Sequence, residues 1–204
     1  MSDIALPSIS GLVDSLLWRV IAPTQQFRSP VDGSLQTGDT QGPRWGAQIK
    51  LRDDLDVDEV QELQGFLLQL RGMVNRALVP NLARSSPRGS ISTVGVTVDG
   101  DVSAGSTQLS LSGCGASGTL VTGDFFKVGD QVLMVVGGPY VADGSGDMAN
   151  VSFEHPLRAD VSDTASVTLS SPACRMVLIS DDAGWTVSPG GYFGMTLEFE
   201  EALA

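Results

Sequence analysis

Hydrophobic and polar positions alternate along most of this chain, which predicts short strands rather than helices. The clearest case is residues 44–51, whose apolar face consists of Trp45, Ala47, Ile49 and Leu51. A period of two is typical of a strand with one buried side. Residues 192–200 repeat the pattern near the end of the chain, with an apolar face made of Phe193, Met195, Leu197 and Phe199. We expect this last strand to rejoin the sheet that contains residues 44–51.

One segment has helical spacing instead. Asp56 and Glu59 form the pattern of a capping box, the reciprocal pairing that starts many helices. The apolar positions that follow lie on one helical face: Val60, Leu63, Phe66, Leu67, Leu70, Met73 and Val74. We expect a helix at about residues 57–72, with Gly72 near its exit, packed by its apolar face on a sheet.

From Ser90 onward, short β-rich pieces are separated by clusters of Gly, Asp, Ser and Pro: 91–98, 107–111, 125–128, 131–136, 149–153, 165–169 and 174–179. This spacing predicts a small barrel or sandwich. Upstream, residues 16–22 predict a strand, and the turn-rich residues 29–43 predict a long loop or a hairpin arm. We therefore expect a mainly β protein, with one domain at residues 1–90 and 181–204 and a second, inserted domain at residues 91–180.

Charge differs between the two halves of the 204-residue chain, whose net charge is −12. Residues 1–90 hold nine basic and ten acidic side chains, whereas residues 91–204 hold three basic and fourteen acidic ones. An acidic surface repels phosphate, so we expect no nucleic-acid recognition. No apolar run approaches the roughly 18–20 residues that span a bilayer, and Asp3 stands where a signal peptide has basic residues. We expect a soluble protein without membrane insertion, made in a cytoplasm.

Catalytic chemistry has few candidate residues. His155 is the only histidine, so a Ser-His-Asp or Cys-His arrangement would have to use it; we expect a surface or turn histidine instead. Adjacent Asp181 and Asp182 are a weak indication of glycosidase chemistry. Cys114 and Cys174 have no metal-ligand spacing and are expected to be buried free thiols, with a disulfide as the alternative. We expect no enzyme, no cofactor, and no catalytic or metal-binding residues.

Two motifs suggest ligand binding only at first sight. A GxGxxG spacing is formed by Gly113, Gly115 and Gly118. Turn and strand residues follow it, although the dinucleotide-binding motif requires a helix there. Positions 1, 3, 5 and 12 of an EF-hand loop are matched by Asp143, Ser145, Asp147 and Glu154. Met148 occupies the position that needs glycine, so we expect an acidic hairpin turn, with a calcium site as the alternative.

Three further features bear on partners. Arginines gather after the expected helix, at Arg71, Arg76, Arg84 and Arg88, and we expect them either in ion pairs between subunits or in hydrogen bonds to loops. Trp185 and Tyr140 are the large aromatic candidates for stacking on a sugar. Residues 123–138, GDFFKVGDQVLMVVGG, predict a hairpin with the two-residue loop Gly129-Asp130 and arms buried within the barrel. Its turn carboxylates are expected to be solvated.

Two blocks of the chain, taken together, carry a family resemblance. The first is FRSPVDGSLQTGDTQGPRWGAQIKL with the helix DVDEVQELQGFLLQLRG. The second runs from GTLVTGDFFKVGDQVLMVVGG through NVSFEHPLRADVSDTASVTLSSPACRMVLISDDAGW to GYFGMTLEFEEAL. From about residue 15 to the C-terminus, the chain resembles tail-tip structural proteins of long-tailed, non-contractile bacteriophages (siphoviruses), of the distal tail type.

The resemblance implies a fold and a role. It implies an N-terminal β-sandwich with one α-helix, plus an inserted small β-barrel or sandwich that hangs outside a ring. The ring, expected to be a hexamer of this chain, would join the tail tube protein to the tail-tip hub and other baseplate proteins. The protein would then reside in the virion tail, after assembly in the host cytoplasm. The inserted domain is smaller than the carbohydrate-binding-like domains of some relatives. The alternatives are a minor tail or tail-completion protein, and a carbohydrate-binding or host-adhesion module of the tail.

Overall fold

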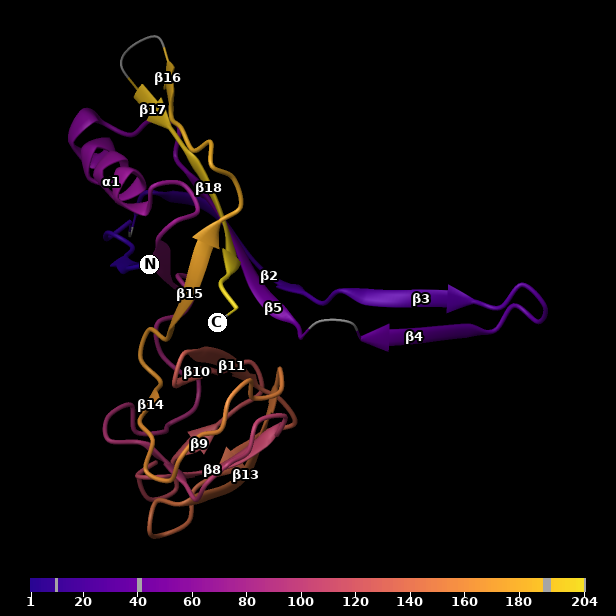
Figure 1. Cartoon of the computed structure of the whole chain (residues 1–204). Helices are drawn as coiled ribbons and strands as arrows, with labels where there is room; N and C mark the ends of the chain where they lie inside the picture. Colours follow the sequence, from indigo (N-terminus) through magenta and orange to yellow (C-terminus); the bar gives the residue numbers. More distant parts are fainter. Residues whose placement is uncertain (10, 40–41, 189–191, 204) are drawn as a thin grey trace.

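The chain forms two β-rich bodies and one long two-stranded projection (Figure 1). The computed structural model describes residues 1–9, 11–39, 42–188 and 192–203. We call the body that carries the helix the sheet domain and the other body the barrel. The projection, made of β3 (Thr24–Arg28) and β4 (Leu35–Asp39), is called the arm. The expectation of a mainly β protein with a single helix and an inserted small barrel is confirmed for the described residues.

The sheet domain is built on one six-stranded sheet. Its strands lie in the order β1 (Asp3–Ala5), β6 (Arg76–Pro80), β15 (Ala173–Leu178), β18 (Thr196–Glu201), β5 (Arg44–Leu51) and β2 (Val13–Ile21). Neighbours are antiparallel except β1 and β6, which are parallel. The face predicted for β5 is buried, since Trp45, Ala47, Ile49 and Leu51 are at most 3% exposed. The period-two reading of this strand is therefore confirmed.

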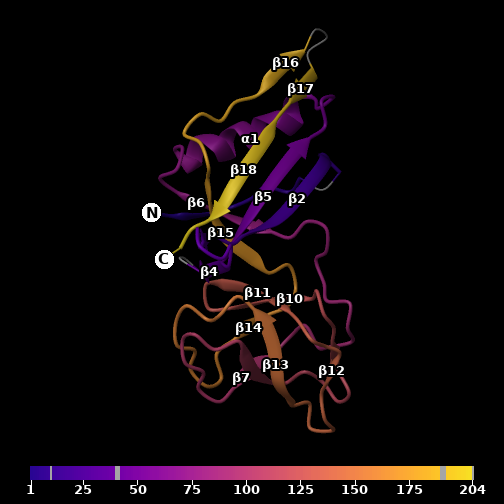
Figure 2. The same ribbon diagram turned by 90° about the vertical axis from the view of Figure 1, so that its right-hand side faces the viewer.

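Helix α1 (Val57–Leu70) covers one face of this sheet (Figure 2). Both halves of the predicted capping box are present: the Glu59 amide donates to Asp56 Oδ1 at 2.9 Å, and the Asp56 amide donates to Glu59 Oε2 at 3.1 Å. Val60, Leu63, Phe66, Leu67 and Leu70 pack into the core of the domain. The helix ends before residue 72 because Arg71 adopts left-handed backbone angles, with φ 52°. Met73 and Val74 consequently leave the predicted face and are exposed.

The barrel is a second six-stranded sheet that nearly closes on itself. Its order is β14 (Val167–Thr168), β10 (Phe125–Val128), β11 (Gln131–Val135), β13 (Met148–Glu154), β8 (Gln108–Ser112) and β7 (Thr97–Asp99). A bridge between Thr97 and Ser166 brings the two ends together. Two short strands, β9 (Thr119–Leu120) and β12 (Tyr140–Val141), form a separate ribbon. The rings of Phe126 and Phe153 meet edge to face inside the barrel, with centroids 5.8 Å apart.

The barrel interrupts the sheet domain between two adjacent strands. The chain leaves from β6 and returns in β15, which pairs with β6. The buried barrel core runs from Ile91 to Leu169. The expected second boundary at residue 180 is wrong, because Cys174, Met176 and Leu178 on β15 belong to the core of the sheet domain. Alternation predicted this strand correctly, but an alternating pattern does not say which sheet a strand joins.

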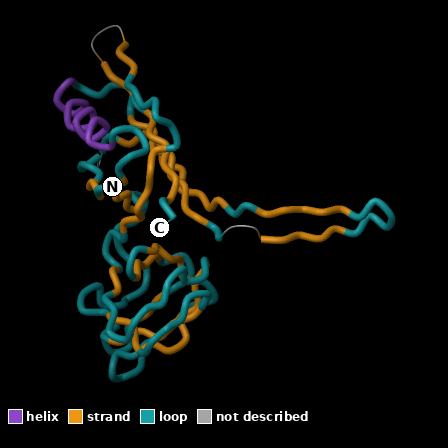
Figure 3. Tube along the Cα trace, in the orientation of Figure 1, coloured by secondary structure: helices purple, strands orange, loops and turns teal. Residues whose placement is uncertain are grey.

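The arm and a second hairpin project from the bodies (Figure 3). The arm confirms the hairpin alternative for the region around residues 29–39, with Thr24 opposite Asp39 and Arg28 opposite Leu35. The second hairpin, β16 (Thr186–Ser188) with β17 (Tyr192–Gly194), projects from the end of the sheet domain that lies farthest from the barrel. The expected strand 192–200 is therefore divided at Met195 into β17 and β18, and the side chain of Phe193 lies outside the described set.

Candidate assembly surfaces and the interdomain joint

The side chains that the structure describes in the arm are exposed to solvent. All five residues of β3 are exposed, Phe27 by 66% of its surface, and Leu35 on β4 is 52% exposed. Within the described residues, β3 and β4 pair only with each other, so both outer edges of the ribbon present free backbone groups. An isolated two-stranded hairpin is marginally stable in water. The arm therefore has the properties of a segment that is stabilised by contact with another surface.

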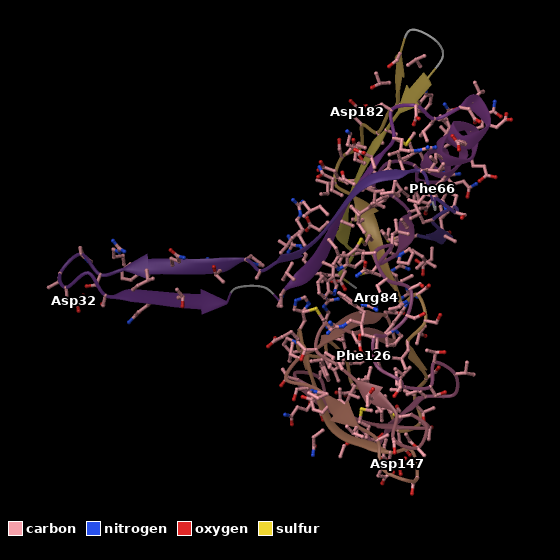
Figure 4. The ribbon with its side chains drawn as sticks, turned by 180° about the vertical axis from the view of Figure 1, so that it is seen from behind. Asp32, Phe66, Arg84, Phe126, Asp147 and Asp182 are labelled. Atoms are coloured by element: carbon pink, nitrogen blue, oxygen red, sulfur yellow. The ribbon has the colours of Figure 1, made fainter. Side chains whose placement is uncertain are left out.

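Hydrogen bonds hold the tip of the arm in a defined shape. The Ser29 amide donates to the Ser34 carbonyl at 2.8 Å, and the Gly33 amide donates to the Ser29 carbonyl at 3.1 Å. Asp32 accepts from the Ser34 amide at 3.0 Å and from the Ser34 hydroxyl at 2.8 Å. Hydrogen bonds from Ser29 and Ser34 lower the pKa of Asp32 to about 2. Figure 4 shows Asp32 at the far end of the arm, away from both bodies.

The root of the arm is a second candidate contact surface. Strand β2 leads directly into the arm and is an edge of its sheet, paired with β5 alone. Leu17 is 47% exposed and Val20 is 48% exposed on this strand. An open edge of nine residues can accept a strand from another chain by backbone hydrogen bonding. The opposite edge of the sheet, β1, has three residues and offers fewer backbone groups for such pairing.

The β10–β11 hairpin, within residues 123–138, forms the joint between the two bodies. Phe126 and Leu133 point into the barrel core, whereas Val132 belongs to the core of the sheet domain, with Phe125 and Met134 packed beside it. The predicted two-residue turn is confirmed, because Val128 pairs with Gln131 and Gly129 has φ 55°. Both faces of the hairpin are therefore buried, one against each body, which accounts for its nearly continuous apolar sequence.

Polar contacts complete the joint. Arg158 of the barrel binds both carboxylate oxygens of Glu201, at 2.6 and 2.9 Å, and also donates to the Pro43 carbonyl at 3.1 Å. The same Glu201 accepts from the Trp45 amide at 3.0 Å. The Trp45 indole N–H donates to the Val132 carbonyl at 2.8 Å. Glu201 is only 4% exposed, so its charge depends on these partners.

His155 lies within this joint: the expected surface placement is wrong, whereas the alternative, a turn histidine, agrees with the structure. It occupies the bend after β13 and is only 5% exposed. Its ring packs on the ring of Trp45, with centroids 4.9 Å apart, and its Nδ1 atom has no hydrogen-bond partner among the described residues. Burial is the largest cause that lowers the pKa of His155. Sequence reasoning missed this placement because Trp45 lies far away along the chain.

Asp124 also departs from expectation, because this turn carboxylate is buried rather than solvated. It is 1% exposed and accepts from three backbone amides: Arg88 at 2.7 Å, Val121 at 2.9 Å and Gly89 at 3.3 Å. Asp124 thereby ties the segment that enters the barrel to the turn that precedes β10. By contrast, Asp130 is 59% exposed in its side chain and forms an ion pair with Arg175.

The two cysteines lie in different cores and are free. Cys114 is in the barrel core and Cys174 is in the core of the sheet domain, both fully buried. Burial raises the pKa of Cys114 to about 11 and that of Cys174 well above its usual value. Nucleophilic cysteines have lowered pKa values, so neither thiol is activated. Among the described residues, no three His, Cys, Asp or Glu side chains are grouped so that they could hold a metal ion.

The glycine motif and the acidic loop are turns in the structure. Gly118 is followed by β9 and not by a helix, and a Cβ on it would lie 2.3 Å from the Cys114 carbonyl oxygen. Asp143 accepts from the amides of Ser145 at 2.8 Å and Asp147 at 3.0 Å, which closes a tight turn. Glu154 lies at the other end of β13, away from these carboxylates.

The predicted partner residues are dispersed. Arg76 pairs with Asp3 at 2.7 Å, Arg84 donates to the Ser86 carbonyl, and Arg88 donates to the Thr122 carbonyl, whereas Arg71 ends the helix. Asp181 accepts from the Met73 amide at 3.3 Å, and the neighbouring Asp182 is exposed. Trp185 is 42% exposed beside β16, at the opposite end of the molecule from Tyr140 on β12 (Figure 2). The two aromatic rings therefore do not form one sugar-stacking platform.

Comparisons with known proteins leave the family open. No protein-family model matches the chain, and no curated protein sequence matches it significantly. Among the described residues, no helix has the length and apolar character needed to cross a membrane.

Proposed function

We propose that this protein is a structural subunit of a phage tail tip, of the distal tail type, that assembles with copies of itself into a ring. In this proposal the ring joins the tail tube to the tail-tip hub, and the arm binds the neighbouring subunit. The barrel is then carried outside the ring. The role is mechanical and involves no catalysis.

The arm is the observation that carries the proposal. Every residue of β3 is exposed, and Phe27 and Leu35 lie in solvent. An isolated subunit would therefore lose little stability if the arm were removed. Its free edges and apolar side chains gain stability when another chain covers them. A ring needs such heterologous contacts, in which one surface of a subunit binds a different surface of the next.

The open β2 edge supports the same proposal. It adjoins the arm and exposes Leu17 and Val20, so that arm and edge together form a continuous two-part surface. An arm from one subunit and an edge from the next are different surfaces. That difference permits a closed ring of more than two copies.

The ring is tested by shortening the arm. A variant in which residues 25–38 are replaced by Asn-Gly should be monomeric by native mass spectrometry, whereas the intact chain should form closed rings visible by electron microscopy. The matched control is Val94→Ser on the barrel, at a residue 82% exposed, which removes an apolar side chain outside the arm and should leave ring formation unchanged. Intact protein that stays monomeric at tens of micromolar, alone and with tail tube protein, would contradict the proposal.

The location in a tail is tested separately. Antibodies against the barrel should label one end of the tail on virions that contain this chain, because the barrel would lie outside the ring. Labelling of the capsid, or of the tail along its whole length, would reject the distal tail role while leaving ring formation intact.

A further inference from the structure

Among the residues that the structure describes, His155 is the one titratable ring at the contact between the two bodies. Trp45 of β5 covers one face of it, and the charged groups facing it are Glu201 at the end of β18, Arg158 of the barrel and Glu154 of β13. The ring contributes to a contact that also includes the Arg158–Glu201 pair and the bond from the Trp45 indole to the Val132 carbonyl. Its surroundings therefore change whenever the barrel moves relative to the sheet domain.

We propose that this joint is a pH-sensitive hinge, in which protonation of His155 in mildly acidic solution weakens the contact and lets the barrel swing away from the sheet domain. The inference goes beyond the tail role and stands whether or not the chain forms a ring.

The closed joint favours the neutral ring. An imidazolium has two N–H donors, and the buried Nδ1 has no acceptor within the described residues. Burial of the ring is the largest cause that favours the neutral form, and the positive charge of Arg158 adds to it, while the carboxylates of Glu201 and Glu154 oppose it in part. Opening the joint would hydrate both ring nitrogens. Protonation is therefore more favourable in the open form than in the closed form.

The direction of the pH effect follows from this difference. The pKa of His155 is lowered in the closed form from the ordinary value of 6.5. Well above pH 6.5 the ring is neutral in both forms, so pH has no effect through this group. Below that value the open form takes up a proton and the closed form does not, which shifts the equilibrium toward opening by about tenfold per pH unit until the closed-form pKa is reached.

The chain has a suitable hinge. It crosses between the bodies twice, at residues 81–90 and 170–172, outside the strands. Asp124 holds Arg88 and Gly89 to the barrel, and the Ser171 amide donates to the Ser85 carbonyl at 2.7 Å. The two crossings are thus tied together, and the free part of the hinge lies before Arg88. Figure 4 shows Arg84 in this position between the bodies.

The first measurement uses the single histidine of the chain. Its Cε1 proton gives one unambiguous NMR signal, which can be followed from pH 8 to pH 4.5. We expect an apparent pKa below 6.5. An apparent pKa at or above 6.5 would overturn the proposal.

The second measurement follows the domain separation. Spin labels at Val94→Cys on the barrel and Leu68→Cys on the helix, which are 82% and 75% exposed, report the distance while the native cysteines stay buried. We expect one distance at pH 7.5 and a second, longer one at pH 5, with unchanged far-ultraviolet circular dichroism. In His155→Phe, the longer distance should be absent at pH 5, because the ring no longer titrates.

The remaining outcomes also decide the question. An equal pH response in His155→Phe would assign the effect to carboxylates and overturn the proposal, as would a single unchanged distance in the native sequence. If His155→Phe does not fold, measurements on the native chain alone still test the proposal. The opening of the native chain must then follow the NMR titration of His155, and opening that begins only after that titration is complete overturns the hinge.

Discussion

Arg158 and Glu201 join the barrel to the sheet domain through two parallel hydrogen bonds of 2.6 and 2.9 Å. The carboxylate side chain is 1% exposed and the arginine side chain is 30% exposed, so the pair is buried on one side and reached by solvent on the other. Two bonds in a fixed fork restrict the angle between the bodies more than one bond does. The pair therefore orients the barrel as well as holding it.

Removing Arg158 alone should be costly. Arg158→Met leaves the Glu201 charge buried without its main partner, and we expect a loss of about 3 kcal/mol in the free energy of unfolding. Urea denaturation measures this loss. The double variant Arg158→Met with Glu201→Met should recover a large part of it, because no buried charge remains. A double variant as unstable as the sum of the single ones would show that the two side chains act independently.

Asp124 should matter more for stability than its position on a turn suggests. Asp124→Asn replaces one of the two accepting oxygens by an NH₂ group, so that either the Arg88 amide or the amides of Val121 and Gly89 lose their acceptor. We expect a loss of about 1–3 kcal/mol in the free energy of unfolding and faster hydrogen exchange at the amides that lose their acceptor. The matched control is Asp99→Asn, at the exposed end of β7, which should change stability by no more than about 0.5 kcal/mol. Unchanged exchange at the three amides would contradict the assigned role.

The capping box should stabilise the helix measurably. Asp56→Ala removes the acceptor for the Glu59 amide, and we expect a loss of about 1 kcal/mol in urea unfolding. Glu62→Ala, on the exposed face of the same helix, should stay within about 0.5 kcal/mol of the native protein. Equal effects of the two substitutions would mean that the cap contributes nothing beyond general surface charge.

Cys114 should make stability fall at high pH. Burial raises its pKa from 9.0 to about 11, so the fold favours the neutral thiol. The contribution of the neutral Cys114 thiol to the free energy of unfolding is complete below pH 9. It is lost as the pH rises through 9 toward 11, because the unfolded chain then releases a proton that the folded chain retains. Cys114→Ala should flatten this decline relative to the native protein in thermal melts between pH 8.5 and 10.5. Parallel melting curves would show that Cys114 is not responsible.

Features that depend on near neighbours were predicted well from the sequence. The Asp56–Glu59 cap, the buried face of residues 44–51 and the Gly129-Asp130 turn all match the structure. Each of them follows from backbone geometry within a few residues. The end of the helix was placed two residues late, because Arg71 takes the left-handed conformation before Gly72 does.

Features that depend on distant partners were missed. The burial of His155 requires Trp45, and the burial of Asp124 requires the amides of Arg88 and Gly89. Nothing in the residues around either side chain indicates these partners. The acids were expected in solvent because turns are usually exposed, but here the turn that contains Asp124 faces the crossing segment.

The sequence by itself determined the mainly β character, the single helix and the presence of two units, since hydrophobic period, capping and turn chemistry are local. Only the tertiary structure decided that β15 belongs to the sheet domain, that the arm stands free, and that residues 123–138 are buried against both bodies. An alternating strand buries one face equally well in either core. Which core it joins depends on the free energy of pairing with strands far away along the chain, and no local pattern encodes that choice.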